Sequence, residues 1–309
     1  VNRERLEQMN LVVLVGSTAV GKTGVAVRLA KALGCHVLNC DSRQIYRGMD
    51  IGTAAPDEEE MDGVVHHFVR MLDPGQPYSA ARYEEDALSV IRRLSCSQRY
   101  AVLSGGSMMY VDAVCHGIDD IPTVDAQVRD RLSQRYGQDG LEPLLAELQR
   151  LDPQYYCTVD RMNHKRVIHA LEICLTSGRA YSTFRMRARK DRPFNIIKVG
   201  LRRERAELFA RVNARADRMM ERGFLDEARS LYSLRGLNAL NTIGYKEMFK
   251  VLAGEWELPM AVERMKKNTR VYAKKQMTWY QRDKDITWFH PDEMEAILAH
   301  IIGLSRLGG

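Results

Sequence analysis

A glycine-rich segment near the amino terminus has the residues needed to bind a chain of phosphates. Residues 16–23 read GSTAVGKT and match the P-loop pattern G-x-x-x-x-G-K-S/T at every defined position. In such a loop backbone N–H groups point inward, the lysine reaches the terminal phosphates, and the last hydroxyl can bind Mg²⁺. We predict that this loop grips a diphosphate or polyphosphate through Gly16, Ser17, Thr18, Ala19, Val20, Gly21, Lys22 and Thr23, with Thr23 as the Mg²⁺ ligand.

An acidic residue is the second candidate for chemistry. Nucleotide-hydrolysing P-loop proteins carry an acid at the end of a buried strand, but the apolar run at 100–106, YAVLSGG, ends in a serine and two glycines. Asp41 instead ends the run at 36–41 and would lie at the same edge of the sheet as the loop. It can be read equally as a turn or helix cap and as a general base. An acid beside a phosphate grip indicates group transfer, either by a small-molecule kinase or by a transferase that releases diphosphate.

The elements that must position these residues alternate between strand and helix patterns. The P-loop follows one apolar run directly and leads into a helical pattern at 23–33. Alternation of this kind predicts a parallel sheet covered by helices. Strands are predicted at 11–15, 36–41, 100–106, 194–201 and 286–289.

The middle of the chain breaks this alternation. Residues 120–192 show helical patterns alone, and they end in a basic stretch. We therefore predict an α/β fold with a P-loop NTPase-like parallel-sheet core, formed by residues 1–119 and 193–309, and an all-helical insertion domain at 120–192.

The composition is typical of a soluble cytosolic protein. Hydrophobic residues make up 45% and charged residues 28% of 309, and the early apolar run is too short to cross a bilayer. The polar amino-terminal segment argues against export. Six scattered cysteines without a Cys-x-x-Cys pair argue against zinc and disulfides. The adjacent His66 and His67 have no acidic cluster nearby, so we assign them no metal.

A basic segment near the carboxyl end indicates a polyanionic partner. Residues 264–282 contain seven basic residues and no acidic one, interleaved with Tyr272, Trp279 and Tyr280. A solvated amphipathic helix is the simpler interpretation, but such helices commonly carry i,i+4 ion pairs. We therefore favour contact with nucleic-acid phosphates. A second basic cluster comprises Arg185, Arg187, Arg189, Lys190 and Arg192.

Five segments together resemble the bacterial tRNA dimethylallyltransferases, also called tRNA isopentenyltransferases. The resemblance covers nearly the whole chain in order. It implies transfer of a dimethylallyl group from dimethylallyl diphosphate to N6 of the adenosine on the 3′ side of the anticodon, with Mg²⁺ as cofactor and the tRNA anticodon stem-loop as partner. The segments are GSTAVGKT at 16–23, DSRQIYRGMDIGTAAP at 41–56, HHFVRMLDPGQPYSAARYEEDA at 66–87, SGGSMMY at 104–110 and IGYKEM at 243–248.

The resemblance also implies roles for individual residues. Asp41 would accept the N6 proton, while Lys22, Thr23 through Mg²⁺, and Arg215 would neutralise the departing diphosphate. Without the resemblance, Arg129 and Arg166 would be read as ordinary surface arginines. The positions expected to contact tRNA are Asp41, Ser42, Arg43, Gln44, Ser107, Arg129, Lys165, Arg166, Val167, Ile168, His169, Asn241, Thr242, Ile243, Gly244, Tyr245 and Lys246.

The chain departs from the family pattern at three positions. Ser17 replaces a usual proline, Ser107 replaces a threonine and keeps its hydroxyl, and Lys165 replaces a glutamine. Two other functions fit the residues alone. One is a kinase in which Asp41 deprotonates a hydroxyl, and the other is a non-catalytic RNA-binding protein.

Overall fold

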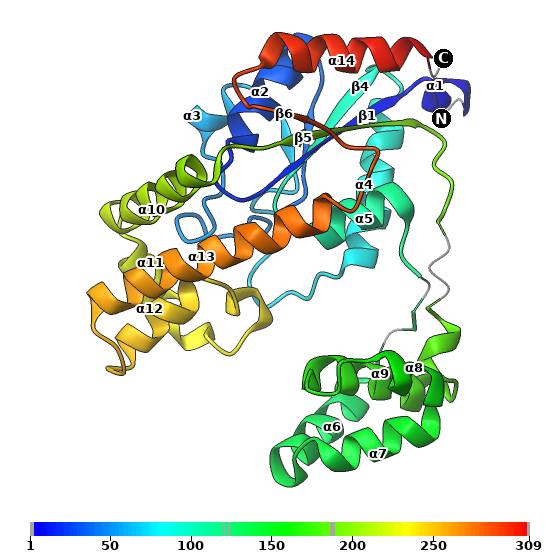
Figure 1. Cartoon of the computed structure of the whole chain (residues 1–309), viewed down its shortest axis with the longest axis vertical. Coiled ribbons are helices and arrows are strands. Elements are labelled where there is room, and N and C mark those ends of the chain that lie inside the picture. Colours follow the sequence, from blue (N-terminus) through cyan, green and yellow to red (C-terminus); the bar gives the residue numbers. More distant parts are fainter. Residues whose placement is uncertain (1–2, 120, 123, 186–188, 308–309) are drawn as a thin grey trace. The chain divides into compact units, whose positions relative to one another are not determined.

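A six-stranded parallel sheet forms the centre of the larger part of the molecule (Figure 1). The computed structural model describes residues 3–119, 121–122, 124–185 and 189–307. The strand order is β3-β2-β4-β1-β5-β6, and each pair of neighbours is parallel. The strands are β1 (Asn10–Gly16), β2 (Val37–Asn39), β3 (His66–His67), β4 (Tyr100–Ser104), β5 (Asn195–Leu201) and β6 (Thr287–Phe289).

The central strand explains why the sequence revealed this sheet. All of β1 is buried, and its side chains alternate between two cores: Leu11 and Val13 pack on one face, Val12 and Leu14 on the other. A strand buried on both faces is apolar throughout, which makes it recognisable. The predicted P-loop NTPase-like α/β fold is therefore confirmed. Only the edge strand β3 was missed, because it consists of two polar histidines.

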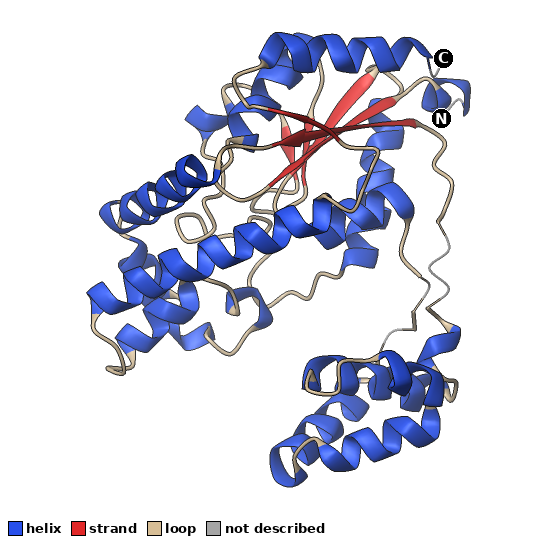
Figure 2. Cartoon of the chain, viewed as in Figure 1, coloured by secondary structure: helices blue, strands red, loops and turns tan. Residues whose placement is uncertain are grey.

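Helices cover both faces of the sheet (Figure 2). On one face, α2 (Lys22–Leu33) and α14 (Met294–Leu307) bury Leu29 and Ile297 in the core that also contains Val12 of β1. On the other face, α4 (Ala80–Leu94) and α5 (Met108–His116) contribute the stacked rings of Tyr83 and Tyr110. The remaining helices of this part are α1 (Arg3–Glu7), α3 (Glu58–Met61), α10 (Arg205–Glu221), α11 (Phe224–Ser230), α12 (Tyr245–Leu252) and α13 (Leu258–Tyr280).

The long helix α13 connects several parts of the core. It packs against α10, α12 and β1, and it contains most of the basic segment 264–282. That segment was predicted to be helical, and the structure confirms this up to Tyr280.

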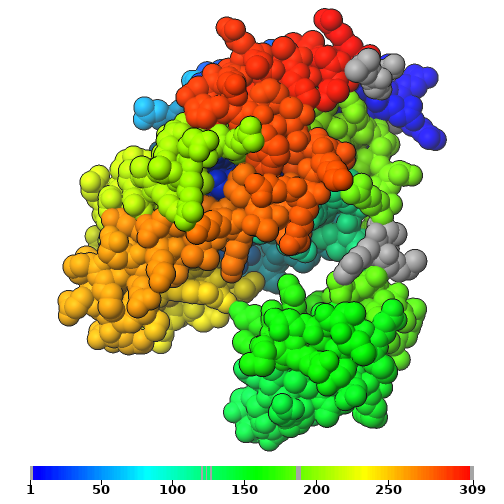
Figure 3. Space-filling model, in the orientation of Figure 1, coloured from blue at the N-terminus to red at the C-terminus, as the bar shows by residue number. Residues whose placement is uncertain are grey.

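In the space-filling view, blue atoms from the amino-terminal part of the chain are visible in a hollow between the yellow-green α10 and the orange carboxyl-terminal part (Figure 3).

The insertion forms a compact unit of its own. The unit comprises residues 116–190, close to the expected 120–192, and residues 1–115 and 191–309 form the other unit. Its core is separate from the two cores that cover the sheet, and it includes Leu132, Leu148 and Leu171. Among the described residues, no helix combines the length and apolar character needed to span a membrane. The helices of the insertion are α6 (Ala126–Asp139), α7 (Glu142–Leu151), α8 (Pro153–Thr158) and α9 (His164–Ser177).

Candidate active site

The predicted P-loop lies between the end of β1 and the start of α2. Gly16 has a φ of +149°, and a Cβ there would come within 2.7 Å of the carbonyl oxygen of Leu201, so no side chain fits. Gly21 takes a left-handed conformation as the N-cap of α2. Ala19, at the tip, has a φ of +64°, which is strained for a residue with a side chain. The loop is therefore shaped by its glycines and held in a conformation that costs free energy.

Lys22 points its ammonium group into this loop. Its Nζ donates to the carbonyl oxygens of Gly16, at 2.9 Å, and Ser17, at 2.8 Å. Burial lowers the pKa of Lys22 to about 8; the attraction of Asp41 opposes this shift, and the repulsion of Arg215 adds to it. A bound anion would favour the charged form of Lys22.

Asp41 follows β2 and uses one carboxylate oxygen locally. Its Oδ1 accepts from the backbone N–H of Arg43, at 2.9 Å, and of Gln44, at 3.4 Å, so of the two local roles predicted the turn residue is confirmed and no helix begins here. The other oxygen, Oδ2, lies next to Gly106: a side chain at position 106 would bring its Cβ within 2.5 Å of Oδ2. Glycine at 106 thus leaves room for the carboxylate, and the cap does not use Oδ2.

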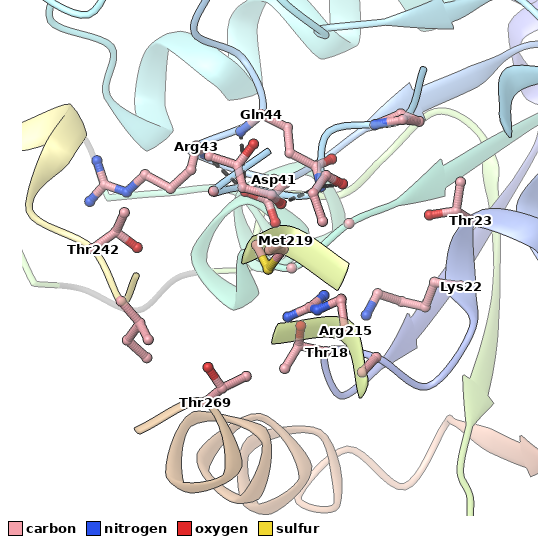
Figure 4. Close-up of a pocket in the computed structure, with 18 of the residues that line it drawn as sticks. Thr18, Lys22, Thr23, Asp41, Arg43, Gln44, Arg215, Met219, Thr242 and Thr269 are labelled. Atoms are coloured by element: carbon pink, nitrogen blue, oxygen red, sulfur yellow. Dashed lines mark hydrogen bonds between the residues drawn. The ribbon is translucent and has the colours of Figure 1, made fainter. Parts of the chain in front are cut away.

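Arg215, on α10, completes a group of charges around one cavity. Figure 4 shows the side chains of Lys22, Asp41 and Arg215 directed toward the same space. Burial lowers the pKa of the Arg215 guanidinium, and the attraction of Asp41 opposes this shift. Arginine nevertheless keeps its charge in proteins. Lys22, Arg215 and Asp41 therefore face a common cavity of about 560 Å³. Other charged residues also line it: Arg43, Glu60, Arg211, Arg218 and Lys246.

Most of the other predicted residues of the larger unit line the same cavity. Gln44 also supports the cavity wall, because its Nε2 donates to the carbonyl oxygens of Thr53, at 3.1 Å, and Ala54, at 2.8 Å. Ser107 has a local role: its hydroxyl accepts from the N–H of Tyr110 at 3.3 Å. The predicted residues that line the cavity are Thr18, Ala19, Gly21, Lys22, Thr23, Asp41, Ser42, Arg43, Gln44, Arg215, Asn241, Thr242, Ile243 and Lys246.

Some predicted residues have buried side chains. Ser17 and Val20 are buried within the P-loop. Tyr245 and Val167, both expected to contact tRNA, are fully buried because they belong to the cores of the two units. In this conformation neither side chain can touch RNA, so their contribution is to packing.

Sequence reasoning missed a carboxylate that joins two walls of the cavity. Glu227, on α11, accepts from three consecutive backbone N–H groups, those of residues 50–52, at 2.7 to 2.9 Å. It also accepts from the hydroxyl of Tyr245 at 2.6 Å. Gly52 and the segment 241–243 line the cavity. No local motif could reveal Glu227, since its partners lie far away in the sequence.

Gln276 is a second residue that the sequence did not single out. It is fully buried on α13, accepts from the N–H of Thr18 at 2.8 Å and donates to the carbonyl oxygen of Gly106 at 2.8 Å. The hydroxyl of Tyr272 donates to the same carbonyl at 3.0 Å. Helix α13 is thus tied to the P-loop and to the glycine that borders Asp41.

The predicted RNA residues of the insertion lie on α6 and α9. Lys165 and Arg166 are exposed in the first turn of α9, whose N-cap Asn163 accepts from the N–H of Arg166 at 3.3 Å. Ile168 is partly buried against the core of this unit. Arg129 and His169 are both bonded to Glu172, which the sequence analysis did not consider.

The two basic clusters differ in how much charge they present. In the segment 264–282, Lys274 and Lys275 are exposed, whereas Lys266 is paired with Asp217 at 2.8 Å. In the second cluster, the Arg192 side chain is buried and bonds to Glu84 at 2.7 Å, so this member of the cluster adds no charge to a basic surface. Arg185 lies over the rings of Tyr155 and Tyr181, and Arg187 lies outside the described residues.

The adjacent histidines His66 and His67 have different partners. His67 Nε2 lies 3.0 Å from His36 Nδ1, and His66 is bonded to the carbonyl oxygen of Val64 at 2.9 Å. Within the described part of the chain, no group of three or more His, Cys, Asp or Glu side chains is placed to hold a metal ion.

The fold and cavity define a P-loop α/β protein in which a phosphate loop, a carboxylate and an arginine meet. Residues 44–283 match the model of the IPP transferase family. The tRNA dimethylallyltransferase 1 of Bacteroides thetaiotaomicron is 53% identical over 291 residues, which cover 94% of each chain. The tRNA dimethylallyltransferase of Christiangramia forsetii is 41% identical over 283 residues, covering 92% of this chain and 94% of that protein. This protein belongs to the IPP transferase family, as the resemblance implied.

Solved structures agree. The full-length tRNA isopentenylpyrophosphate transferase of Bacillus halodurans superposes with a TM-score of 0.70 at 37% identity, covering 96% of this chain and 98% of that one. A eukaryotic dimethylallyltransferase acting on tRNA gives a TM-score of 0.78 at 24% identity, covering 93% and 75%. The second comparison supports the fold.

Proposed function

We propose that this protein transfers a dimethylallyl group from dimethylallyl diphosphate to N6 of the adenosine on the 3′ side of the anticodon in tRNA, releasing diphosphate. The observation that carries the proposal is the convergence of Lys22, Asp41 and Arg215 on one cavity. A diphosphate needs the same cradle as a nucleotide tail, which accounts for a P-loop. Because the proposed substrate is tRNA, we infer a cytoplasmic reaction.

The proposed reaction is a single displacement. A new bond forms between N6 and C1 of the dimethylallyl group as the bond from C1 to the diphosphate oxygen breaks. The N6 lone pair is delocalised into the adenine ring, so removal of its proton by Asp41 Oδ2 would assist. The bonding electrons leave with the diphosphate, where Lys22 and Arg215 would neutralise the added charge. Anticodon-loop bases are only partly stacked, so extrusion of the target base costs little.

Mg²⁺ fits this cavity as a companion of the diphosphate. Mg²⁺ is usually held by one or two protein oxygens together with phosphate oxygens and water. The exposed Thr23, at the end of the P-loop, lines the cavity together with Asp41 and offers one such oxygen. When bound, the ion would supply positive charge to the leaving group.

One assay separates this function from its rivals. Unmodified tRNA is incubated with radiolabelled dimethylallyl diphosphate, and a parallel reaction contains labelled ATP. We expect label from the prenyl donor in the tRNA and no phosphate transfer from ATP. Phosphate transfer would support a kinase, and binding of tRNA without any transfer would support a non-catalytic RNA-binding protein.

Donor binding should weaken above about pH 8. The free protein has Lys22 with a pKa of about 8, and a bound diphosphate favours the ammonium form. Binding above that pH must take up a proton, so the affinity should fall by up to about tenfold per pH unit as pH rises. The measurement is the donor Kd between about pH 7 and about pH 9.5 in wild type and Lys22→Arg, which keeps its charge throughout. A wild-type Kd that does not change above pH 8 would contradict this role.

Binding of tRNA should depend steeply on salt, because the exposed lysines of α13 are proposed to contact phosphates. Replacing Lys274 and Lys275 with alanine should flatten the plot of log Kd against log salt by about 0.7 to 0.9 per lost contact. Lys266→Ala is the matched control, since this lysine of the same helix is already paired with Asp217 and Glu263. Donor Kd should stay constant in all variants. Equal slopes for wild type and the double variant would make the segment a solvated helix face.

A further inference from the structure

A buried carboxylate in the insertion holds two basic side chains that reach the surface. Glu172 Oε1 accepts from Arg129 Nε at 3.0 Å, and its Oε2 lies 3.4 Å from His169 Nδ1. The Glu172 side chain is 7% exposed, whereas those of Arg129 and His169 are 57% and 47% exposed. The carboxylate therefore sits beneath its partners, which come from two helices, α6 and α9.

Burial of the Glu172 carboxylate costs free energy, so its position needs an explanation. Its neighbours in α9, Leu171 and Ile173, are core residues of this unit. A carboxylate taken out of water is unfavourable unless its oxygens find donors. Here each oxygen has one partner. The bond to Arg129 uses Nε–H, so the terminal Nη groups of the half-exposed guanidinium are not needed for it.

We propose that Glu172 is a positioning residue that holds Arg129 and His169 as a fixed pair for binding RNA phosphate. The proposal rests on the proposed function, in which the insertion contacts tRNA. Fixing a long arginine in advance lowers the conformational entropy lost on binding. A guanidinium held at Nε presents its remaining donors in a plane suited to a phosphate.

Charge alone predicts the opposite effect of removing this residue. Glu172 is negative and lies close to a surface that would meet a polyanion. Its removal makes the insertion more positive, which by itself strengthens RNA binding. If removing Glu172 nevertheless weakens RNA binding, the loss must come from poorer positioning of Arg129 and His169.

The test compares Glu172→Ala and Glu172→Gln with Glu147→Ala. Glu147 forms a similar interhelical pair with Arg135 in the same unit, at 2.7 Å, and removing it changes the net charge equally. We expect tRNA Kd to rise about tenfold in Glu172→Ala, the loss of one hydrogen bond to a charged group. Glu172→Gln keeps an acceptor for Arg129 and should recover part of this loss. Glu147→Ala changes the charge without touching Arg129 or His169, so it should not raise Kd. Donor KM should be constant in all three.

Folding is monitored by Tm, and a double-mutant cycle covers the case in which Glu172→Ala does not fold. Arg129→Ala should weaken tRNA binding more in the wild type than in Glu172→Gln, because the arginine is less well held in the variant. Equal effects in both backgrounds would overturn the proposal, as would unchanged tRNA affinity in a folded Glu172→Ala. If wild type neither binds nor prenylates tRNA, the proposed function itself fails.

Discussion

Replacing Asp41 with asparagine should lower the single-turnover rate of prenyl transfer by a factor of about 100 or more, the usual effect of losing a general base. Asparagine keeps the size of the side chain and an oxygen for the N–H groups of Arg43 and Gln44. It cannot accept the N6 proton. The tRNA Kd should change little, so the loss should lie in the chemical step.

Asp41→Ala serves as the comparison that separates the two roles of this residue. If Asp41 acts only as a cap, asparagine should restore nearly normal rates and alanine should not. If it acts as a base, both variants should be slow. A near-normal single-turnover rate for Asp41→Asn would therefore remove Asp41 from the chemistry and leave it as a turn residue.

Arg215→Ala and Lys22→Ala should both lose more in turnover than in donor binding. In the proposed reaction the two cations face charge that grows on the diphosphate as its bond to carbon breaks, so their attraction would be strongest in the transition state. Loss of one such group costs about 10² to 10³ in kcat for comparable sites. The measurements are kcat from multiple-turnover assays and donor Kd from direct binding.

Arg205→Ala is the matched control for Arg215. It removes an arginine from the same helix, but Arg205 is exposed and lies 5.2 Å from the Phe209 ring centre. Its replacement should leave kcat and donor Kd unchanged. A higher donor Kd in Arg215→Ala, with kcat unaltered, would assign Arg215 to ground-state binding.

The parts of the site that the sequence predicted are local. The P-loop is a continuous run whose shape depends on its own glycines, and Asp41 caps residues two and three positions later. The strands could be recognised in the sequence because central parallel strands are apolar on both faces. Such features depend on residues that are close together in the chain, so they can be predicted from a single sequence.

The supports of the site could not be predicted, because their partners are distant in the chain. Glu227 meets the N–H groups of residues 50–52, and Gln276 meets Thr18. In the sequence Glu227 is one acid among many, and Gln276 lies in a basic segment read as surface. Burial also separated residues that looked alike: Arg192 is enclosed with Glu84, whereas Lys274 is exposed.

The junction of the insertion has a consequence for how this architecture can change over evolution. The N–H of Lys190 donates to the carbonyl oxygen of His116 at 2.8 Å, so the unit leaves the core beside the point where it enters. In the larger unit, the guanidinium of Arg192, just after the insertion, donates to the carbonyl oxygens of Ala113 and Val114, just before it. Loop-closure entropy rises only slowly with length once two ends are held together. The insertion can therefore be lengthened, shortened or exchanged for another module while the sheet keeps its strand register, which leaves the insertion free to diverge faster than the P-loop core.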